Sequence, residues 1–342
     1  MKWKGNCQTT AMGIMPHDNV EEALSLALSL DIPFWPQLQK VSFFEDMYVQ
    51  ASEHFPGMTL DVVNQKINFT TESFYEQLPE YLEHLDEKDY FAVSDEYSMV
   101  YNSFLAENLN KYTAIRGQLI GPVSFGMKIN DEQLKPIIYN SEVKGLLYEF
   151  FAKKVNVQCE QLKKKNDNAF MWLDEPGLEI IFGSFTGYTS ETAREDYREF
   201  LQLIDSPVGV HLCGNPDWSF LLNQNISILS LDAFSCGQVF MRYRDEIKAF
   251  LAQGRYIAWG IVPTLSEELN GMQTLDLVNR LEEMWNYLAK NGISKDALLR
   301  QSLLAPARCC LLNADKTKTV EKAFTLLTDV SQTIREKYNL FD

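Results

Sequence analysis

The sequence predicts an α/β protein built on a (β/α)8 barrel, because short apolar runs alternate along it with longer segments of helical period. Each run is expected to be a strand of a parallel sheet, and each longer segment a helix that crosses back over that sheet. Eight such units suit a closed TIM barrel better than an open sheet. We therefore expect residues 1–342 to form a single catalytic barrel, with a helical elaboration at residues 41–112 in the N-terminal third.

The expected elements follow one another in a regular order. Strands are expected at 9–12, 32–35, 115–120, 170–173, 208–212, 226–231, 256–259 and 303–305. Helices are expected at 20–30, 133–165, 191–204, 218–222, 241–251, 276–291 and 319–338. Residues 41–112 are richer in charged and aromatic side chains, which favours helix and loop there. A doubly wound sheet is the alternative; against it, Gly13 follows the first run without the other two glycines of a Gly-x-Gly-x-x-Gly turn.

The composition is that of a globular, acidic protein. Among 342 residues, 31 Lys+Arg stand against 47 Asp+Glu, a formal net charge of −16. This charge repels a phosphate backbone, so we expect no nucleic-acid partner. No run approaches the ~18 apolar residues of a membrane span and no signal peptide is visible, so we expect a cytoplasmic protein away from the membrane. The six cysteines are sparse and irregularly spaced, so a functional cysteine is expected to ligate metal or act as a nucleophile.

Reactive side chains fall at the carboxyl ends of the expected strands. In a parallel barrel these ends converge on one rim, where active sites lie. The residues concerned are Asp174 and Glu175, His211 and Cys213, Asp232, and the adjacent pair Cys309 and Cys310. Segments nearly a hundred residues apart are therefore expected to meet at one site.

His211 and Cys213 form the sharpest pattern, because residues two apart on a strand point to the same face. One cysteine of the pair Cys309 and Cys310 would join them from the last strand, and Asp232 could add a carboxylate. This N, S, S, O set suits a tetrahedral zinc ion. The alternative is a buried histidine with one hydrogen bond beside cysteines that pack as small apolar side chains.

The acidic pair Asp174 and Glu175 has two interpretations. It can hold a substrate ammonium group or serve as acid and base, or it can cap a helix and order a loop. Gln118 could offer its amide to a substrate, or it could form a hydrogen bond inside the barrel.

Several segments together resemble the zinc-dependent methyltransferases of the superfamily that joins cobalamin-independent methionine synthase with uroporphyrinogen decarboxylase. The resemblance covers most of the chain, from Thr10 to about Leu327. Segment 10–17 resembles the opening of the synthase's catalytic barrel, and Asp-Glu-Pro-Gly-Leu at 174–178 is similar to its Asp-Glu-Pro-Ala-Leu. Val-His-Leu-Cys-Gly-Asn at 210–215 resembles the zinc motif shared with methylcobamide:thiol methyltransferases. Segments 229–232 and 304–309 resemble the strand that ends in the zinc carboxylate and the C-terminal Pro-x-Cys zinc segment.

The resemblance implies a function for each matched residue. It implies a zinc ion held by His211, Cys213 and Cys309, with Asp232 as a displaceable fourth ligand. Asp174 and Asp232 would be catalytic, and Asp174 would anchor the ammonium group of homocysteine. The residues expected to bind substrate are Gly13, Gln118, Asp174, Glu175 and Asn215.

The sequence also departs from this family at several positions. Ile14 replaces the serine usual after the first glycine, Asp232 replaces the longer glutamate, and the last cysteine follows Pro306 by three residues instead of two. Segment 260–264 lacks the histidine that folate-dependent synthases use, and the length is that of one barrel where the full synthase has two. The missing histidine and the single-barrel length point to a methylated corrinoid as methyl donor. No Asp-x-His-x-x-Gly corrinoid signature occurs, so the corrinoid is expected to be free or on another protein.

Three rival functions stay open. The first is a methylcobamide:thiol methyltransferase acting on another thiol, such as coenzyme M. The second is a metal-free tetrapyrrole decarboxylase, in which the His-x-Cys pattern would be unexplained. The third is a non-enzymatic protein that binds corrinoid or thiol.

Overall fold

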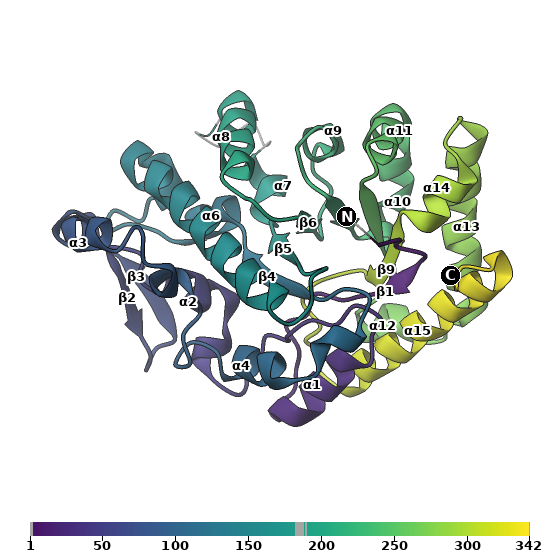
Figure 1. Cartoon of the computed structure of the whole chain (residues 1–342), viewed down its shortest axis with the longest axis horizontal. Helices are drawn as coiled ribbons and strands as arrows, with labels where there is room; N and C mark the ends of the chain where they lie inside the picture. The colour runs from purple at the N-terminus through teal and green to yellow at the C-terminus, as the bar shows by residue number, and fades with distance from the viewer. Residues whose placement is uncertain (1–2, 182–187, 189, 342) are drawn as a thin grey trace.

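The computed structural model describes residues 3–181, 188 and 190–341, and its centre is a curled parallel β-sheet (Figure 1). Within these residues the sheet has seven strands in the order β1-β9-β8-β7-β6-β5-β4, and each neighbouring pair is parallel. The strands are β1 (Gln8–Thr9), β4 (Arg116–Ile120), β5 (Phe170–Asp174), β6 (Val208–Leu212), β7 (Ile228–Leu231), β8 (Tyr256–Val262) and β9 (Ser302–Pro306). The expectation of an α/β protein with a parallel sheet is confirmed.

The expected closed barrel of eight strands is not confirmed. Segment 32–35, expected as the second strand, is not a strand of the sheet. It lies between the two sheet edges and makes one backbone–backbone hydrogen bond to each, with Ile32 N donating to Thr9 O (3.0 Å) and Arg116 N donating to Pro33 O (3.2 Å). Pro33 and Pro36 have no N–H to donate, so a continuous ladder cannot form here. A pattern of apolar side chains does not detect missing backbone donors, which is why it predicted a strand here.

Helices cover the outside of the sheet, and Figure 1 shows α6, α8, α9, α11, α13 and α15 arranged around it. The described helices are α1 (Val20–Leu28), α2 (Met47–Ser52), α3 (Thr71–Glu83), α4 (Met99–Ala106), α5 (Pro122–Lys128), α6 (Ser141–Lys163), α7 (Gly177–Ile181), α8 (Ser190–Gln202), α9 (Trp218–Leu222), α10 (Ala233–Phe240), α11 (Arg244–Ala252), α12 (Ser266–Leu269), α13 (Thr274–Lys290), α14 (Lys295–Arg300) and α15 (Lys318–Tyr338). The helix expected at 133–165 begins only at Ser141, because Asn140 accepts from two backbone N–H groups as its N-cap. No described helix is long and apolar enough to cross a bilayer.

Residues 41–112 are not only helix and loop. Besides α2, α3 and α4 they contain an antiparallel hairpin of β2 (Met58–Asp61) and β3 (Lys66–Phe69). These strands alternate apolar and polar residues but have only four residues each and are mostly solvent-accessible, so they do not form a buried apolar run. Aromatic side chains of this segment pack on the sheet's helical layer, with Phe55 and Tyr81 centred 5.2 and 6.1 Å from Phe150 of α6.

The interior of the curled sheet is filled by side chains. They form a separate buried cluster of Trp3, Met12, Ile32, Ala114, Phe170, Trp172, Ile228, Tyr256, Ala258, Leu303 and Cys309. At the amino end of the strands, Trp3 packs on Phe170 and Tyr256, with ring centroids 6.0 and 5.3 Å apart. The Tyr256 hydroxyl also donates to the Trp3 carbonyl oxygen. This end is thereby closed, and the polar residues lie at the opposite, carboxyl end.

Candidate metal centre

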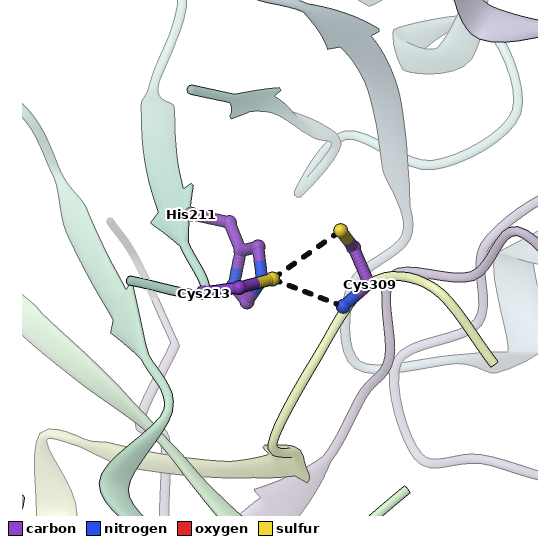
Figure 2. Close-up of side chains that lie close together, drawn as sticks. All are labelled: His211, Cys213 and Cys309. Atoms are coloured by element: carbon purple, nitrogen blue, oxygen red, sulfur yellow. Dashed lines mark hydrogen bonds between the residues drawn. The ribbon is translucent and has the colours of Figure 1, made fainter. Parts of the chain in front are cut away.

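Three potential metal ligands meet at the carboxyl end of the sheet, as Figure 2 shows. His211 Nε2 lies 2.9 Å from Cys213 Sγ, and Cys213 Sγ lies 3.3 Å from Cys309 Sγ. All three ligand atoms lie within 4.8 Å of one another. The structure thus brings together the imidazole and the two thiols that the sequence grouped, although 96 residues separate the two cysteines.

The strand register explains how His211 is aimed. In neighbouring strands Asp174, His211 and Ser230 stand side by side, so their side chains share the inner face. His211 Nδ1 lies 2.9 Å from Ser230 Oγ, which leaves Nε2 facing the sulfurs. A hydrogen bond to the far ring nitrogen commonly fixes a metal-binding histidine. Ser230 was not among the predicted site residues. Its spacing could have indicated it, because it precedes Asp232 by two residues and residues two apart on a strand point to the same face.

Cys309 reaches the centre from the loop that follows β9. Its carbonyl oxygen accepts from Ile14 N (2.9 Å), and Leu311 N donates to Ile14 O (2.9 Å), which fixes the chain on both sides of the vicinal pair. The Cys309 side chain is buried, whereas Cys310 is exposed and does not belong to the group of three. Cys309, and not Cys310, therefore lies with His211 and Cys213 in this structure.

The contact between the two sulfurs shifts their pKa values in opposite directions. The pKa of Cys213 is lowered well below its ordinary value, because the Cys309 thiol donates a hydrogen bond to it; burial opposes this and His211 adds to it. The backbone N–H of Cys309 also donates to Cys213 Sγ (3.3 Å). Conversely, the pKa of Cys309 is raised because its proton is held against Cys213, and burial raises it further. Burial lowers the pKa of His211, but the charge of Cys213, the hydrogen bond to Cys213 and the charge of Asp174 together raise the pKa overall.

This donor set fits a soft divalent cation. Tetrahedral zinc at ~2.3 Å from sulfur and ~2.0 Å from nitrogen places two sulfurs about 3.8 Å apart and a nitrogen about 3.5 Å from a sulfur. The observed 3.3 and 2.9 Å distances are shorter by about half an ångström, which side-chain rotation can supply. Three protein ligands leave one tetrahedral position for a further ligand, as in catalytic rather than structural zinc sites.

Asp174 borders the three ligands. Its side chain is buried, and its Oδ1 atom has no hydrogen-bond partner within the described part of the chain. Burial raises the pKa of Asp174 to about 7; the negative charge of Cys213 adds to this, and His211 opposes it. A buried carboxyl oxygen without a partner is costly unless a ligand satisfies it.

Asp232 does not join the metal ligands. Its Oδ1 accepts from Ser235 N (2.7 Å) as the N-cap of α10, and its Oδ2 lies 3.6 Å from Arg308 Nε. Aspartate is one methylene shorter than the glutamate of the family motif, and both oxygens are drawn toward these two donors. The expectation that Asp232 is a zinc ligand is therefore not met by the geometry.

Glu175 and Gln118 are both engaged by their own chain. The Glu175 carboxylate accepts from Val123 N, Ser124 N and Ser124 Oγ, at 3.3, 2.9 and 2.6 Å. It thus orders the start of α5, which corresponds to the loop-ordering alternative. Gln118 donates to Trp35 O (2.8 Å) inside the curled sheet and has no free amide to offer.

Gly13 and Asn215 also have structural partners. A Cβ atom on Gly13 would stand 3.1 to 3.3 Å from Met15, Leu311 and Phe34, so the glycine permits close packing. Asn215 Oδ1 accepts from Trp218 Nε1 (2.9 Å), and its backbone N–H donates to Glu179. These contacts fix the loop after Cys213 and leave Asn215 itself exposed.

The comparisons with known proteins bear on the fold. No protein-family model matches the sequence, and no curated protein matches it. Among solved structures, the chain is similar to a methyltransferase from Methanosarcina mazei, with a TM-score of 0.53 and 14% sequence identity. The likeness covers 99% of this chain and 95% of that chain. At this identity it establishes a shared α/β fold over nearly the full length of both proteins, whereas chemistry has to be argued from the site.

Proposed function

We propose that this protein is a zinc-dependent methyltransferase that moves a methyl group from a methylated corrinoid to a thiol, with homocysteine as the foremost acceptor. The observation that carries the proposal is the cluster of His211, Cys213 and Cys309 at the carboxyl end of the sheet. The likeness in fold to a protein described as a methyltransferase adds support. A metal-free decarboxylase would leave these two adjacent sulfurs without a role.

In this proposal His211, Cys213 and Cys309 hold the zinc ion, which when bound lowers the pKa of the substrate thiol so that it is present as thiolate near neutral pH. Ser230 keeps the imidazole of His211 aimed at the ion through the bond to Nδ1. The thiolate then attacks the methyl carbon, and a sulfur–carbon bond forms as the cobalt–carbon bond breaks. The bonding pair stays on cobalt, so Co(I) leaves without needing a proton, and the thiol proton passes to solvent.

Asp174 is the proposed anchor for the acceptor's ammonium group. Its unpartnered Oδ1 favours homocysteine over a thiol without a cationic group, such as coenzyme M. A bound ammonium would lower the pKa of the carboxyl from about 7 and keep it ionised. Glu175 supports the loop beside it by bonding to α5, and in this proposal it does not touch the substrate.

The test pairs metal analysis with turnover of methylcobalamin. Wild-type protein is expected to bind one equivalent of zinc and to methylate homocysteine faster than coenzyme M. His211→Ala, Cys213→Ser and Cys309→Ser are expected to lose both zinc and activity. Cys310→Ser is the matched control, because it removes the adjacent but exposed thiol, and it is expected to keep both. Retention of one equivalent of zinc by Cys213→Ser would refute the assignment.

A further inference from the structure

A buried arginine lies beneath the metal centre without an ion-pair partner. The Arg116 side chain is fully buried, and its guanidinium is held between the rings of Phe34 and Trp172, 4.8 Å from each centroid. Its hydrogen bonds all go to uncharged oxygens, those of Thr10, Gly117 and Gln118. No carboxylate of the described residues stands within 4.0 Å, and Nη2 has no hydrogen-bond partner there.

The position of this charge relates it to the metal ligands. Trp172 contacts the guanidinium on one side, and its ring lies 6.5 Å from that of His211. Arg116 pairs with Phe170 at the start of β5, and Asp174, at the end of the same strand, pairs with His211. The stack of Arg116, Trp172 and His211 therefore runs from the interior toward the centre.

A buried, unpaired cation requires compensation. Guanidinium stays protonated in proteins, and burying a charge without a partner is strongly unfavourable. Burial lowers the pKa of Arg116 well below its ordinary value, and the charge that opposes this is that of Asp174. The two flanking rings contribute cation–π attraction. The compensating negative charge thus lies at the metal-centre end of the interior.

We propose that Arg116 is a positioning residue that makes the open position of the metal centre select anionic sulfur ligands over neutral ones. This inference rests on the proposed function, because it presumes a divalent ion on His211, Cys213 and Cys309. Binding such an ion adds two positive charges while the two cysteines release at most two protons, so the centre does not become more negative. Binding a substrate thiol as thiolate releases one further proton and adds one negative charge. A fixed positive charge close by therefore favours the second step and does not favour the first.

The test uses Co²⁺-substituted protein, with 2-mercaptoethanol as anionic probe and imidazole as neutral probe at one fixed pH. Absorbance of the cobalt centre reports the affinity for each probe, independently of methyl transfer. Arg116→Met removes the charge while keeping much of the apolar contact, and Arg116→Lys retains the charge. Arg116→Met is expected to bind one equivalent of Co²⁺, to lose roughly tenfold in affinity for 2-mercaptoethanol, and to keep its imidazole affinity within about twofold. Arg116→Lys is expected to stay close to wild type for both probes.

The outcomes separate this inference from the proposed function. Equal affinities of wild type and Arg116→Met for the thiol probe overturn the inference, and so does an equal loss for both probes, which would indicate a packing role. If wild-type protein binds neither Co²⁺ nor Zn²⁺, the proposed function falls and the inference with it. Should Arg116→Met fail to fold by circular dichroism, Arg116→Gln, which retains a polar side chain beside Gln118, provides the same comparison.

Discussion

Replacing Asp232 by alanine tests whether this carboxylate is a metal ligand or a helix cap. The sequence pattern places it among the zinc ligands, whereas the structure places it at the start of α10. If the carboxylate caps the helix, its removal costs stability and leaves the metal in place. If it ligates zinc, its removal weakens metal binding.

The size of the stability effect follows from two contacts. Loss of an N-cap acceptor, here the bond from Ser235 N, costs about 1 kcal/mol. Arg308 lies 3.6 Å from Asp232 Oδ2, and its side chain is 35% exposed, so solvent screening limits this pair to about 0–1 kcal/mol. The unfolding free energy should therefore fall by about 1–2 kcal/mol. For a chain of this size the Tm then falls by about 1.5–3 °C.

The assay measures zinc per chain after loading and desalting, alongside thermal unfolding of the same samples. Asp217→Ala is the matched control, because Asp217 caps α9 through Ser219 N and pairs with Arg194 in the same way. Both variants are expected to show a similar fall in Tm and to retain one equivalent of zinc. Loss of zinc from Asp232→Ala alone would refute this reasoning and make Asp232 a ligand.

Three further predictions follow from other contacts. Ser230→Ala should weaken zinc affinity about tenfold to a hundredfold at unchanged stoichiometry, because it releases His211; unchanged chelator competition would contradict this. Trp3→Ala should lower the unfolding free energy by about 3–5 kcal/mol in urea titrations while the folded protein still loads zinc, because the floor of the interior is emptied. Burial lowers the pKa of Lys154 to about 8, so the unfolded chain binds more protons and stability should rise by about 3 kcal/mol between pH 8 and pH 10.5. The double variant Lys154→Met with Glu53→Gln should lose this rise in stability. If its stability still rises with pH as in the wild type, Lys154 is not the cause of the rise.

The parts of the fold that apolar patterns predicted are the strands buried on both faces. Strands β5 to β9 are predominantly apolar runs between helices, and such runs are typical of parallel sheets. Segment 32–35 is also apolar, but Pro33 within it and Pro36 after it lack the N–H donors that a strand needs. The hairpin of β2 and β3 escaped prediction because its apolar and polar residues alternate over only four residues in each strand, the shortest run in which alternation indicates a strand. The bond from Asn64 N to Asp61 Oδ1 (3.0 Å) defines the turn between them.

The candidate site was predictable only in part, for a related reason. The period of two on a strand placed His211 and Cys213 together, and resemblance to a known motif favoured Cys309. Side chains that hydrogen-bond to their own backbone were harder to place, because a carboxylate at a strand end can cap the next helix or face the site. Asp232 caps the next helix, α10. Arg116 lies at the start of the buried strand β4. A basic residue in such a strand indicates a buried charge that needs compensation.

The last ligand of the proposed centre depends on the first strand of the sheet. Ile14 follows β1 and bonds through its backbone N–H and carbonyl to Cys309 O and Leu311 N, both at 2.9 Å. Its side chain is not the hydroxyl of the family motif, yet these bonds need only its backbone, so the substitution leaves the position of Cys309 intact. In the proposed function, the hydroxyl that the resembled family carries at this position is absent, which leaves recognition of a charged acceptor to Asp174. A polar substitution at Ile14 is therefore expected to alter acceptor choice without altering zinc content.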